Sequence, residues 1–220
     1  MYINTDEKTM HFPHAIKKST GNDGIIRAVD ILAALFALIL FSPIMLLVAF
    51  LIKIEDPKAP VIFRQERIGQ GGKKFYMYKF RSMYTDAEDR LSELLAQNEV
   101  EGHMFKMKND PRVTKIGKLI RKLSIDEFPQ FVNVLNGDMS MVGPRPPLER
   151  EFNNYTNHDK KRLLVKPGCT GLWQVSGRNT LSFEEMIELD LEYIEKRNIF
   201  FNIKIMLLTF KEITVFGKGM

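Results

Sequence analysis

The adjacent carboxylates Asp126 and Glu127 are the residues of this sequence whose types and spacing best suit chemistry on a phosphate group. They follow Ser124, and a serine three residues before a glutamate is also the signature of a helix capping box. In that structural role, Glu127 would accept a hydrogen bond from the Ser124 amide, and Asp126 would lie at the positive end of the helix dipole. The pair alone favours this structural interpretation, so a catalytic role depends on the residues around it.

Basic residues near glycines, prolines and a predicted hairpin could supply the positive charge that a phosphate requires. Arg121 lies shortly before the carboxylates, and the others are Lys79, Arg81, Arg112, Arg145 and Arg178. Arginine binds phosphate in a bidentate manner, and a helix N-terminus attracts anions. If the cations neutralise the phosphate oxygens, one carboxylate can attack phosphorus while its neighbour holds Mg²⁺, which usually takes only one or two ligands from protein. The pattern therefore predicts phosphoryl transfer.

The rest of the composition excludes several other kinds of site. No Ser-His-Asp pattern, H-E-x-x-H motif or dinucleotide-binding fingerprint is present, and the single cysteine, Cys169, excludes an internal disulfide. The cluster Gly69–Gly72 lacks the spacing of a phosphate-binding loop, so we interpret it as a turn. A net charge of +5 and a pI near 9.2 favour a partner that carries phosphates. Nucleic acid is the weaker candidate, because the basic residues accompany an apolar segment and lack an aromatic pattern for stacking on bases.

The apolar segment runs from Ile31 to Ile52 without a charged residue. It is long enough to cross a hydrocarbon core of about 30 Å, and it lacks the position and cleavage site of a signal peptide. Pro43 should bend the helix because proline has no backbone donor, and the Ser42 hydroxyl can hydrogen-bond the carbonyl that is freed. Basic residues flank both ends, so the charges alone favour neither a bent spanning helix nor a re-entrant helix that enters and leaves by one face.

The chain after this segment has the pattern of a globular domain. Two β-rich runs, residues 60–69 and 73–83, predict a hairpin in which Lys79 and Arg81 share one face. Helices are expected from Thr85 to Leu95, from Val113 to Leu123, from Ser124 to Asn136, from Glu149 to Arg162 and from Ser182 to Lys196. The amphipathic basic helix from Val113 could lie in a membrane interface or pack as an ordinary surface helix, and the apolar stretch from Ile199 to Phe216 could lie along a bilayer.

Taken in order, these motifs resemble the bacterial sugar transferase family, the monotopic polyprenyl-phosphate phosphoglycosyl transferases. The matching stretches are Tyr78–Met83, Asn109–Thr114, Leu119–Gln130, Asn133–Pro146, and Lys166-Pro167-Gly168 through Gly177-Arg178. Each stretch is a weak signal alone, but their order and density are specific, and the resemblance runs from about Ile25 to the C-terminus. Larger members of this family carry additional transmembrane helices before the unit, which this sequence does not contain.

The resemblance implies a reaction in two steps. Asp126 would attack the β-phosphorus of a UDP-sugar and release UMP, and polyprenyl phosphate would then take the sugar phosphate from the aspartate. The resemblance also implies that Glu127 binds Mg²⁺, that Arg121 binds phosphate, and that Arg145 belongs to a Pro-Arg-Pro loop. Such a reaction would be the first membrane step in the synthesis of an exopolysaccharide, capsule, O-antigen or glycoconjugate.

The sequence therefore predicts an α+β protein, mainly helical with a small β-hairpin. Because Ser42-Pro43 matches the bend of a re-entrant helix in this family, we expect a monotopic protein held by one such helix and by interfacial helices. The expected units are a polar tail (residues 1–24), the re-entrant helix (25–54), a catalytic domain (55–198) on the cytoplasmic face of the bacterial inner membrane, and a C-terminal interfacial segment (199–220). The expected partners are a UDP-sugar, polyprenyl phosphate and the lipid bilayer, and not nucleic acid.

The alternative is a non-catalytic membrane-bound protein that binds nucleotides or anionic lipids. It would account for the charge and the anchor, but it would not need the carboxylate pair beside Arg121. The sequence leaves open which sugar is transferred, which glycan is built and whether the protein forms a homodimer.

Overall fold

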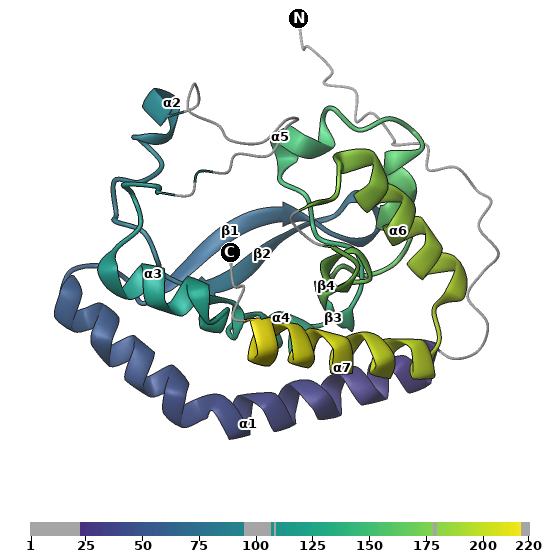
Figure 1. The fold of residues 1–220 in the computed structure, drawn as a ribbon, viewed down its shortest axis with the longest axis horizontal. Helices are drawn as coiled ribbons and strands as arrows, with labels where there is room; N and C mark the ends of the chain where they lie inside the picture. Colours follow the sequence, from purple (N-terminus) through teal and green to yellow (C-terminus); the bar gives the residue numbers. More distant parts are fainter. Residues whose placement is uncertain (1–22, 95–106, 108, 178–179, 217–220) are drawn as a thin grey trace, which may run out of the picture.

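The computed structural model describes residues 23–94, 107, 109–177 and 180–216. The expected polar tail, apart from its last two residues, and Arg178 therefore lie outside the described residues. Figure 1 shows helix α1 (Asp23–Glu55) as a long arc, with the other elements on its concave side. The helices nearest to this arc are α3 (Lys115–Lys122), α4 (Gln130–Asn136) and α7 (Ile199–Phe216). The described part is mostly helical with two small sheets, as the predicted α+β class requires.

The predicted hairpin is confirmed. Strands β1 (Ile62–Ile68) and β2 (Lys74–Phe80) pair antiparallel, with Phe63 opposite Lys79 and Arg67 opposite Phe75. The connection is a short 3-10 turn in which Gly71 has φ of 68°, a backbone conformation that favours glycine. The glycine cluster therefore forms a turn, as predicted.

A second sheet holds the Pro-Arg-Pro loop in place and was not predicted. Strand β3 (Ser140–Val142) pairs in parallel with β4 (Gly168–Thr170). A Cβ atom added at Gly168 would lie only 2.0 Å from the backbone nitrogen of Gly143, so the two chain segments can approach this closely only because both residues are glycines. The loop that begins at Gly143 is consequently anchored against the segment around Gly168.

The middle of α1 confirms the predicted bend. Pro43 lies inside the helix, and the arc in Figure 1 curves around the rest of the molecule. The Ser42 hydroxyl donates a hydrogen bond of 2.8 Å to the carbonyl of Ile39, the group that the proline at position 43 leaves without its usual partner. The serine thus satisfies the carbonyl, as the sequence predicts.

Polar contacts fix the first half of α1 to the domain. Asp30 is buried and accepts hydrogen bonds from the Ser140 hydroxyl at 2.7 Å and from the Met141 amide at 3.0 Å. Arg27 donates to two carbonyls at the end of α4, at 2.6 and 2.9 Å. Between these polar contacts and the bend, Ala34 packs into a core with residues of β2 and α4.

The other end of α1 is fixed to the same domain. Val48 and Ile52 pack against Phe80 and Ile120 in a second core. The Glu55 carboxylate accepts hydrogen bonds of 2.8 and 3.1 Å from the first two amides of α3, which lack partners within their own helix. Both ends of α1 are therefore held by one domain.

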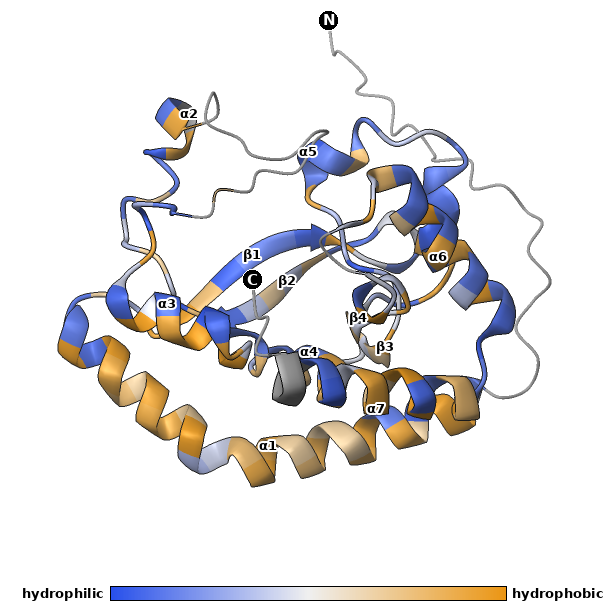
Figure 2. Ribbon diagram, viewed as in Figure 1, coloured by the Kyte–Doolittle hydropathy of each residue, from blue (hydrophilic) through white to orange (hydrophobic). Residues whose placement is uncertain are grey.

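Apolar side chains cover the outer surface of α1 and continue onto its neighbours. Figure 2 shows α1 orange over most of its length, whereas β1 and α5 (Glu149–Phe152) are mostly blue. Among the described residues, α1 is the helix that is long and apolar enough to cross a membrane. The exposed apolar side chains include Phe36, Ile39, Leu46 and Phe50 of α1, Leu119 of α3 and Leu123 just after it, and Phe200, Leu207 and Phe210 of α7. The structure thus has the long apolar helix that the sequence predicts, with many of its apolar side chains exposed.

The helix expected from Thr85 to Leu95 is wrong in its first part. Residues 85–90 form turns, and helix α2 covers Leu91–Leu94 of the described residues. The Arg112 guanidinium donates a hydrogen bond of 3.2 Å to the Ala87 carbonyl. This contact uses a carbonyl that a helix beginning at Thr85 would need for its own hydrogen bonds.

The helix expected from Glu149 to Arg162 is also wrong, because it is two short pieces. Helix α5 ends at Phe152, and a 3-10 helix spans Asp159–Leu164. Between them, the Asp159 carboxylate accepts a hydrogen bond from the Thr156 amide at 2.8 Å, and the Thr156 hydroxyl accepts one from the Asp159 amide at 3.2 Å. These side chains compete for backbone groups and so interrupt the helix.

The acidic helix was predicted correctly. Helix α6 (Phe183–Lys196) begins with a capping box in which Ser182 and Glu185 each bind the backbone amide of the other.

Helix α3 begins two residues later than expected. Thr114 caps it through a hydrogen bond of 2.9 Å from the Gly117 amide, and Val113 forms an isolated β-bridge with Met83.

Candidate active site

The two candidate carboxylates lie on a short 3-10 turn, Ile125–Glu127, between α3 and α4. The expected capping box is wrong, because Ser124 has φ of 56° and its side chain makes no capping hydrogen bond. Its amide donates instead to the Arg121 carbonyl at 3.0 Å. A left-handed residue in this position ends a helix, so Ser124 terminates α3 and does not begin the next helix.

Asp126 is almost fully buried, at 4% exposure, although it is a carboxylate. Its pKa is raised to about 6, mainly by burial. The positive charges of Lys79 and Arg121 lower the pKa, and the negative charge of Glu127 raises it. The carboxylate is therefore close to two cations and one like charge in a region with little water. It would be mostly ionised at neutral pH and poorly solvated, which suits a nucleophile.

Lys79 reaches the site from the end of β2. Its ammonium group lies 2.7 Å from the Glu127 carboxylate, and the two side chains are 18% and 30% exposed. Lys79 forms an ion pair with Glu127, and its charge also acts on Asp126. It therefore connects the hairpin to the 3-10 turn. The sequence-based prediction that Lys79 and the carboxylates belong to one site is consistent with this contact.

Arg121 reaches the site from the last turn of α3. Its Nε donates a hydrogen bond of 2.8 Å to the Ser82 hydroxyl, and burial lowers its pKa against the opposing charge of Asp126. Helix α3 can approach this closely because residue 117 is glycine. A Cβ atom added there would lie 2.0 Å from the Ser82 carbonyl oxygen. The close packing of α3 on Ser82 therefore determines where Arg121 lies.

Two other predicted phosphate-binding arginines have structural partners. Arg81 donates to the Pro60 carbonyl at 2.9 Å, and its guanidinium lies 5.6 Å from the centre of the Phe63 ring. Arg112 is buried and forms an ion pair of 2.7 Å with Asp110. These contacts do not place either arginine beside Asp126, and their binding of phosphate stays a prediction, as does that of Arg178.

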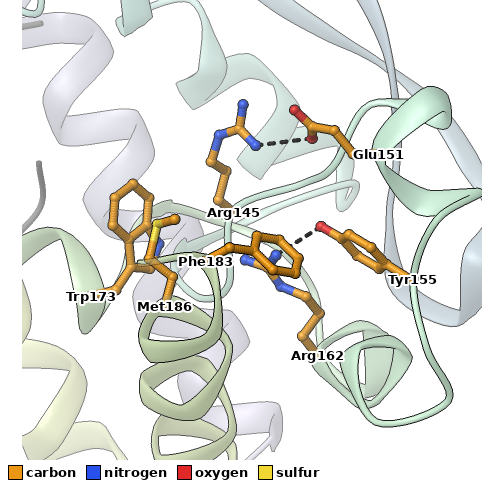
Figure 3. A pocket seen from close by; sticks show the side chains of 7 residues that line it. All are labelled: Arg145, Glu151, Tyr155, Arg162, Trp173, Phe183 and Met186. Carbon is orange, nitrogen blue, oxygen red and sulfur yellow. Dashed lines mark hydrogen bonds and ion pairs between the residues drawn. The ribbon is translucent and has the colours of Figure 1, made fainter. Parts of the chain in front are cut away.

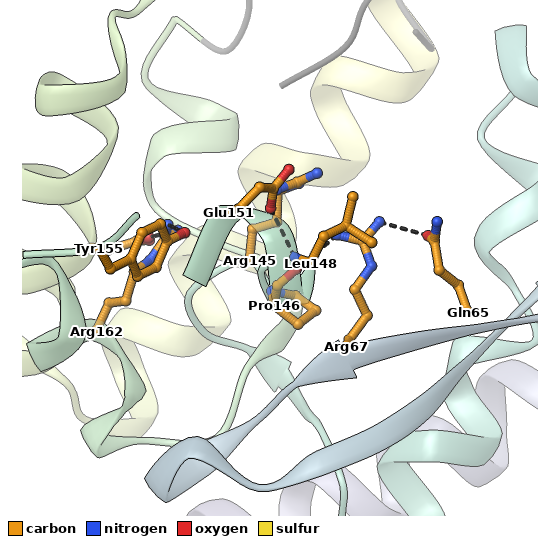
Figure 4. Close-up of polar contacts among 9 residues, drawn as sticks. Gln65, Arg67, Arg145, Pro146, Leu148, Glu151, Tyr155 and Arg162 are labelled. Carbon is orange, nitrogen blue, oxygen red and sulfur yellow. Dashed lines mark hydrogen bonds and ion pairs between the residues drawn. The ribbon is translucent and has the colours of Figure 1, made fainter. Parts of the chain in front are cut away.

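Arg145 and the buried Arg67 form a second basic group around the Pro-Arg-Pro loop (Figure 4). Arg145 lies 3.1 Å from the Glu151 carboxylate, and Arg67 donates to the Pro146 carbonyl at 3.0 Å and to Gln65 at 2.6 Å. The pKa of Arg67 is lowered to about 9. Burial is the main cause and the nearby charge of Arg145 adds to it, whereas the carboxylates of Glu151 and Glu127 oppose both effects. Our sequence analysis did not identify Arg67, although the alternation of β1 places it on the same face as Phe63.

A pocket adjoins this basic group (Figure 3). Its lining comes from the Pro-Arg-Pro loop, from α5 and the segment that follows it, from the 3-10 turn Trp173–Val175 and from the start of α6. The lining residues are Arg145, Glu151, Tyr155, Arg162, Trp173, Phe183 and Met186. Of these lining residues, Arg162 forms a buried ion pair with Asp190 and donates a hydrogen bond of 2.8 Å to the Tyr155 hydroxyl. The sequence did not identify this group, because Arg162 and Asp190 are far apart in the chain.

The description "bacterial sugar transferase" belongs to a family model that matches residues 21–216, nearly the whole chain. The chain belongs to the bacterial sugar transferase family. The match covers α1, the hairpin, the 3-10 turn with both carboxylates, and the pocket, so the family unit and the described fold coincide.

Curated members of the family resemble this chain over most of its length. It is 49% identical over 195 residues to the galactosyl transferase CpsE of Streptococcus agalactiae, and the matched region covers 88% of this chain and 42% of CpsE. It is 42% identical to the UDP-glucose:undecaprenyl-phosphate glucose-1-phosphate transferase of Escherichia coli, over 83% of this chain and 39% of that protein. It is also 42% identical to the uncharacterized sugar transferase EpsL of Bacillus subtilis, over 86% of this chain and 87% of EpsL. The chain thus spans about two fifths of the first two relatives and most of the third.

The donor set of this site is compatible with Mg²⁺ only if a bound substrate contributes ligands. No group of three or more metal-ligating side chains occurs among the residues that the structure describes. Two neighbouring carboxylates are what Mg²⁺ commonly takes from a protein when nucleotide phosphates and water complete its shell. Glu127, with part of its side chain exposed, fits that role better than the buried Asp126.

Proposed function

We propose that this sugar transferase moves a sugar 1-phosphate from a UDP-sugar to polyprenyl phosphate at the cytoplasmic face of the bacterial inner membrane. The observation that carries the proposal is the burial of Asp126 within reach of the charges of Lys79, Glu127 and Arg121. The name of the Escherichia coli relative supports the donor class, the phosphate-linked sugar and the polyprenyl acceptor.

In the first step, a carboxylate oxygen of Asp126 attacks the β-phosphorus of the UDP-sugar. The bond between that phosphorus and the oxygen bridging to the α-phosphorus breaks, and UMP leaves. The sugar phosphate is then held on Asp126 as an acyl phosphate. Lys79 and Arg121 lie where they can stabilise the negative charge of the phosphoryl oxygens.

In the second step, a phosphate oxygen of polyprenyl phosphate attacks the same phosphorus. The bond to Asp126 breaks, which restores the carboxylate and yields the polyprenyl diphosphate sugar. The 3-10 turn is well placed for a lipid acceptor, because Phe128, the residue after Glu127, packs on Phe41 of α1 with ring centres 4.6 Å apart. The catalytic turn therefore lies against the bend of the apolar helix.

Glu127 would hold Mg²⁺ in this reaction. The bound ion would supply positive charge to the phosphate oxygens of the donor. In the structure, the ion pair with Lys79 holds the Glu127 carboxylate next to the end of β2.

We also propose that α1 is re-entrant. Its first half is fixed to the domain through Asp30 and its last turn through Glu55, and a helix crossing the bilayer would have to release one of these contacts. To test this, Cys169 is replaced by serine and a single cysteine is introduced by Asn4→Cys. Intact cells are then treated with a membrane-impermeant thiol reagent, with Asn154→Cys in the exposed part of the domain as control. Both cysteines should react only after lysis, and reaction of the Asn4→Cys protein in intact cells would contradict the proposal.

The transfer itself is tested by UMP release. The purified protein, Mg²⁺ and undecaprenyl phosphate are incubated with a panel of UDP-sugars, using Asp126→Asn as the inactive variant and Asp138→Asn as a matched control. The wild type and the control should release UMP with at least one donor, and Asp126→Asn should not. Release of UMP by a folded Asp126→Asn protein would exclude the nucleophile, and nucleotide binding without release from any donor would favour the non-catalytic alternative.

A further inference from the structure

The pocket next to Arg145 has a polar group that the transfer reaction leaves unexplained. Trp173 is 9% exposed, and its indole N–H has no hydrogen-bond partner in the described structure. A buried donor without a partner is unfavourable, and exceptions of this kind call for an explanation. Trp173 lines the pocket together with Phe183 and Met186, so an acceptor entering the pocket could meet both the donor and apolar surface (Figure 3).

The groups around the pocket provide several donors, and one oxygen of its carboxylate, Glu151 Oε2, is already engaged. The Glu151 carboxylate accepts hydrogen bonds from Arg145 at 3.1 Å and from the Leu148 amide at 2.8 Å. The Tyr155 hydroxyl accepts one from Arg162 at 2.8 Å. Arg162 also has a buried Nε without a partner among the described residues. A ligand that presents acceptors and an apolar face would therefore complement the unpaired donors and the apolar lining.

A uracil ring has these properties. It is planar, it carries two carbonyl oxygens, and its faces can stack on aromatic side chains. A hexose is a poorer match, because it has no planar aromatic ring to stack on these side chains. Met186 has an unbranched, flexible side chain that can turn aside when a ring enters this narrow space.

The pocket is connected to the catalytic turn by positive charge. Arg145 lies at the pocket with its side chain 29% exposed, so its charge can reach a ligand. Arg67 is close enough for its pKa to respond to both Arg145 and Glu127, after the larger effect of burial. Arg67 also donates to the Pro146 carbonyl at 3.0 Å, so it lies beside the loop that carries Arg145. A nucleotide diphosphate could follow this positive charge from Asp126 to the pocket.

We infer that the pocket formed by Trp173, Phe183 and Met186 binds the uracil ring of the donor, with the Trp173 N–H donating to a ring carbonyl and Arg145 facing the phosphate side. This inference rests on the proposed transferase function and adds the residues that select the nucleotide. Trp173 and Arg145 are binding residues in this assignment, because neither is placed at the reacting phosphorus.

Trp173 is the single tryptophan of the sequence, so its fluorescence reports on this pocket directly. We would titrate the full-length Asp126→Asn protein in detergent with uridine, UMP and galactose 1-phosphate. This variant retains the pocket but lacks the nucleophile. Uridine and UMP should change the emission saturably, with UMP binding more tightly because it adds a phosphate near Arg145, and galactose 1-phosphate should have no effect at the same concentrations.

A second measurement separates binding from structure. Trp173→Phe keeps an aromatic ring but removes the N–H, so the KM for the UDP-sugar should rise about tenfold, as expected for one lost hydrogen bond, while kcat changes less than twofold. Tyr193→Phe is the matched control, because it also removes a buried aromatic donor. The Tyr193 hydroxyl does not line the pocket, and it donates a hydrogen bond of 2.9 Å to the Val142 carbonyl. The KM of this control should be unchanged, and thermal unfolding shows that both variants fold.

The outcomes distinguish this inference from the function on which it rests. A response to galactose 1-phosphate but not to uridine would assign the pocket to the sugar, and an unchanged KM in Trp173→Phe would remove the indole from recognition. Either result overturns the inference while UMP release in the wild type keeps the transferase intact. A saturable response to uridine in a protein whose wild type releases no UMP would support the subsite and refute the transferase.

Discussion

Replacing Asp126 by asparagine should stabilise the folded protein at neutral pH while it abolishes transfer. The carboxylate is 4% exposed, and burial raises its pKa to about 6 from 3.8. The folded protein therefore binds this proton more tightly than the unfolded chain does. At pH 7 the ionised carboxylate opposes folding, whereas an asparagine of similar shape carries no charge.

The size of the effect follows from the two pKa values. At ~1.4 kcal/mol per pH unit, a change from 3.8 to about 6 corresponds to about 3 kcal/mol. Below pH 3.8 both states of the wild type are protonated, so the variant has no electrostatic advantage there. The advantage grows between pH 3.8 and 6 and is complete above pH 6, where it should raise the Tm by roughly 6–12 °C for a chain of this size.

Thermal unfolding in detergent at pH 4 and pH 7.5 measures this difference. The wild type, Asp126→Asn and the control Asp138→Asn would be compared by circular dichroism. Only Asp126→Asn should gain stability on going from pH 4 to pH 7.5 relative to the wild type. A variant less stable than the wild type at pH 7.5, or a difference that does not depend on pH, would show that burial of the charge has been misjudged.

Three further results are expected. In Gly117→Ala, the new Cβ would lie 2.0 Å from the Ser82 carbonyl oxygen, where ordinary contact begins at 3.4 Å, so α3 must move by about 1.4 Å and carry Arg121 with it. UMP release should fall ~100-fold, and thermal unfolding should show a loss of about 1–3 kcal/mol in the free energy of unfolding. Wild-type activity in this variant would contradict the role given to this packing. Glu127→Gln should lose activity, and excess EDTA should do the same to the wild type, whereas the exposed control Glu195→Gln should retain it; full activity in EDTA would exclude the metal. Pro43→Ala should straighten α1 and lower UMP release in lipid bilayers, and an unchanged rate would mean that the bend does not position the catalytic turn.

Local signals in the sequence were sufficient for the elements whose geometry depends on neighbours in the chain. The proline and serine at the bend of α1 predicted both the kink and the partner of the freed carbonyl. The glycine cluster predicted a hairpin turn, and Ser182 with Glu185 predicted the start of α6. In each case the residues that make the contact are only a few positions apart.

The predictions that failed depended on residues distant in the chain or on an unusual backbone conformation. Ser124 has the pattern of a helix cap, but the reversal of the chain after α3 puts it in the left-handed region. Thr85 was expected to begin a helix, but Arg112 takes the Ala87 carbonyl that the helix would need. Such competition arises only when the chain has folded, so a local pattern does not reveal it.

The candidate site shows the same division. Asp126 and Glu127 could be singled out because adjacent carboxylates near arginines suit phosphate chemistry. The contacts that set their properties come from other elements, Lys79 from the hairpin and Arg121 through the packing of Gly117. The pocket of Trp173 joins segments that no spacing in the sequence relates.

The most direct test of the proposed mechanism is intact-protein mass spectrometry of the enzyme with Mg²⁺ and its UDP-sugar in the absence of polyprenyl phosphate. We expect the protein to gain the mass of one sugar phosphate as UMP is released, with the added mass on the peptide that contains Asp126, and to lose it when polyprenyl phosphate is added. Asp126→Asn should gain no mass. Release of UMP only when both substrates are present, without any adduct, would contradict the covalent mechanism, and an adduct on another residue would contradict the assignment of Asp126.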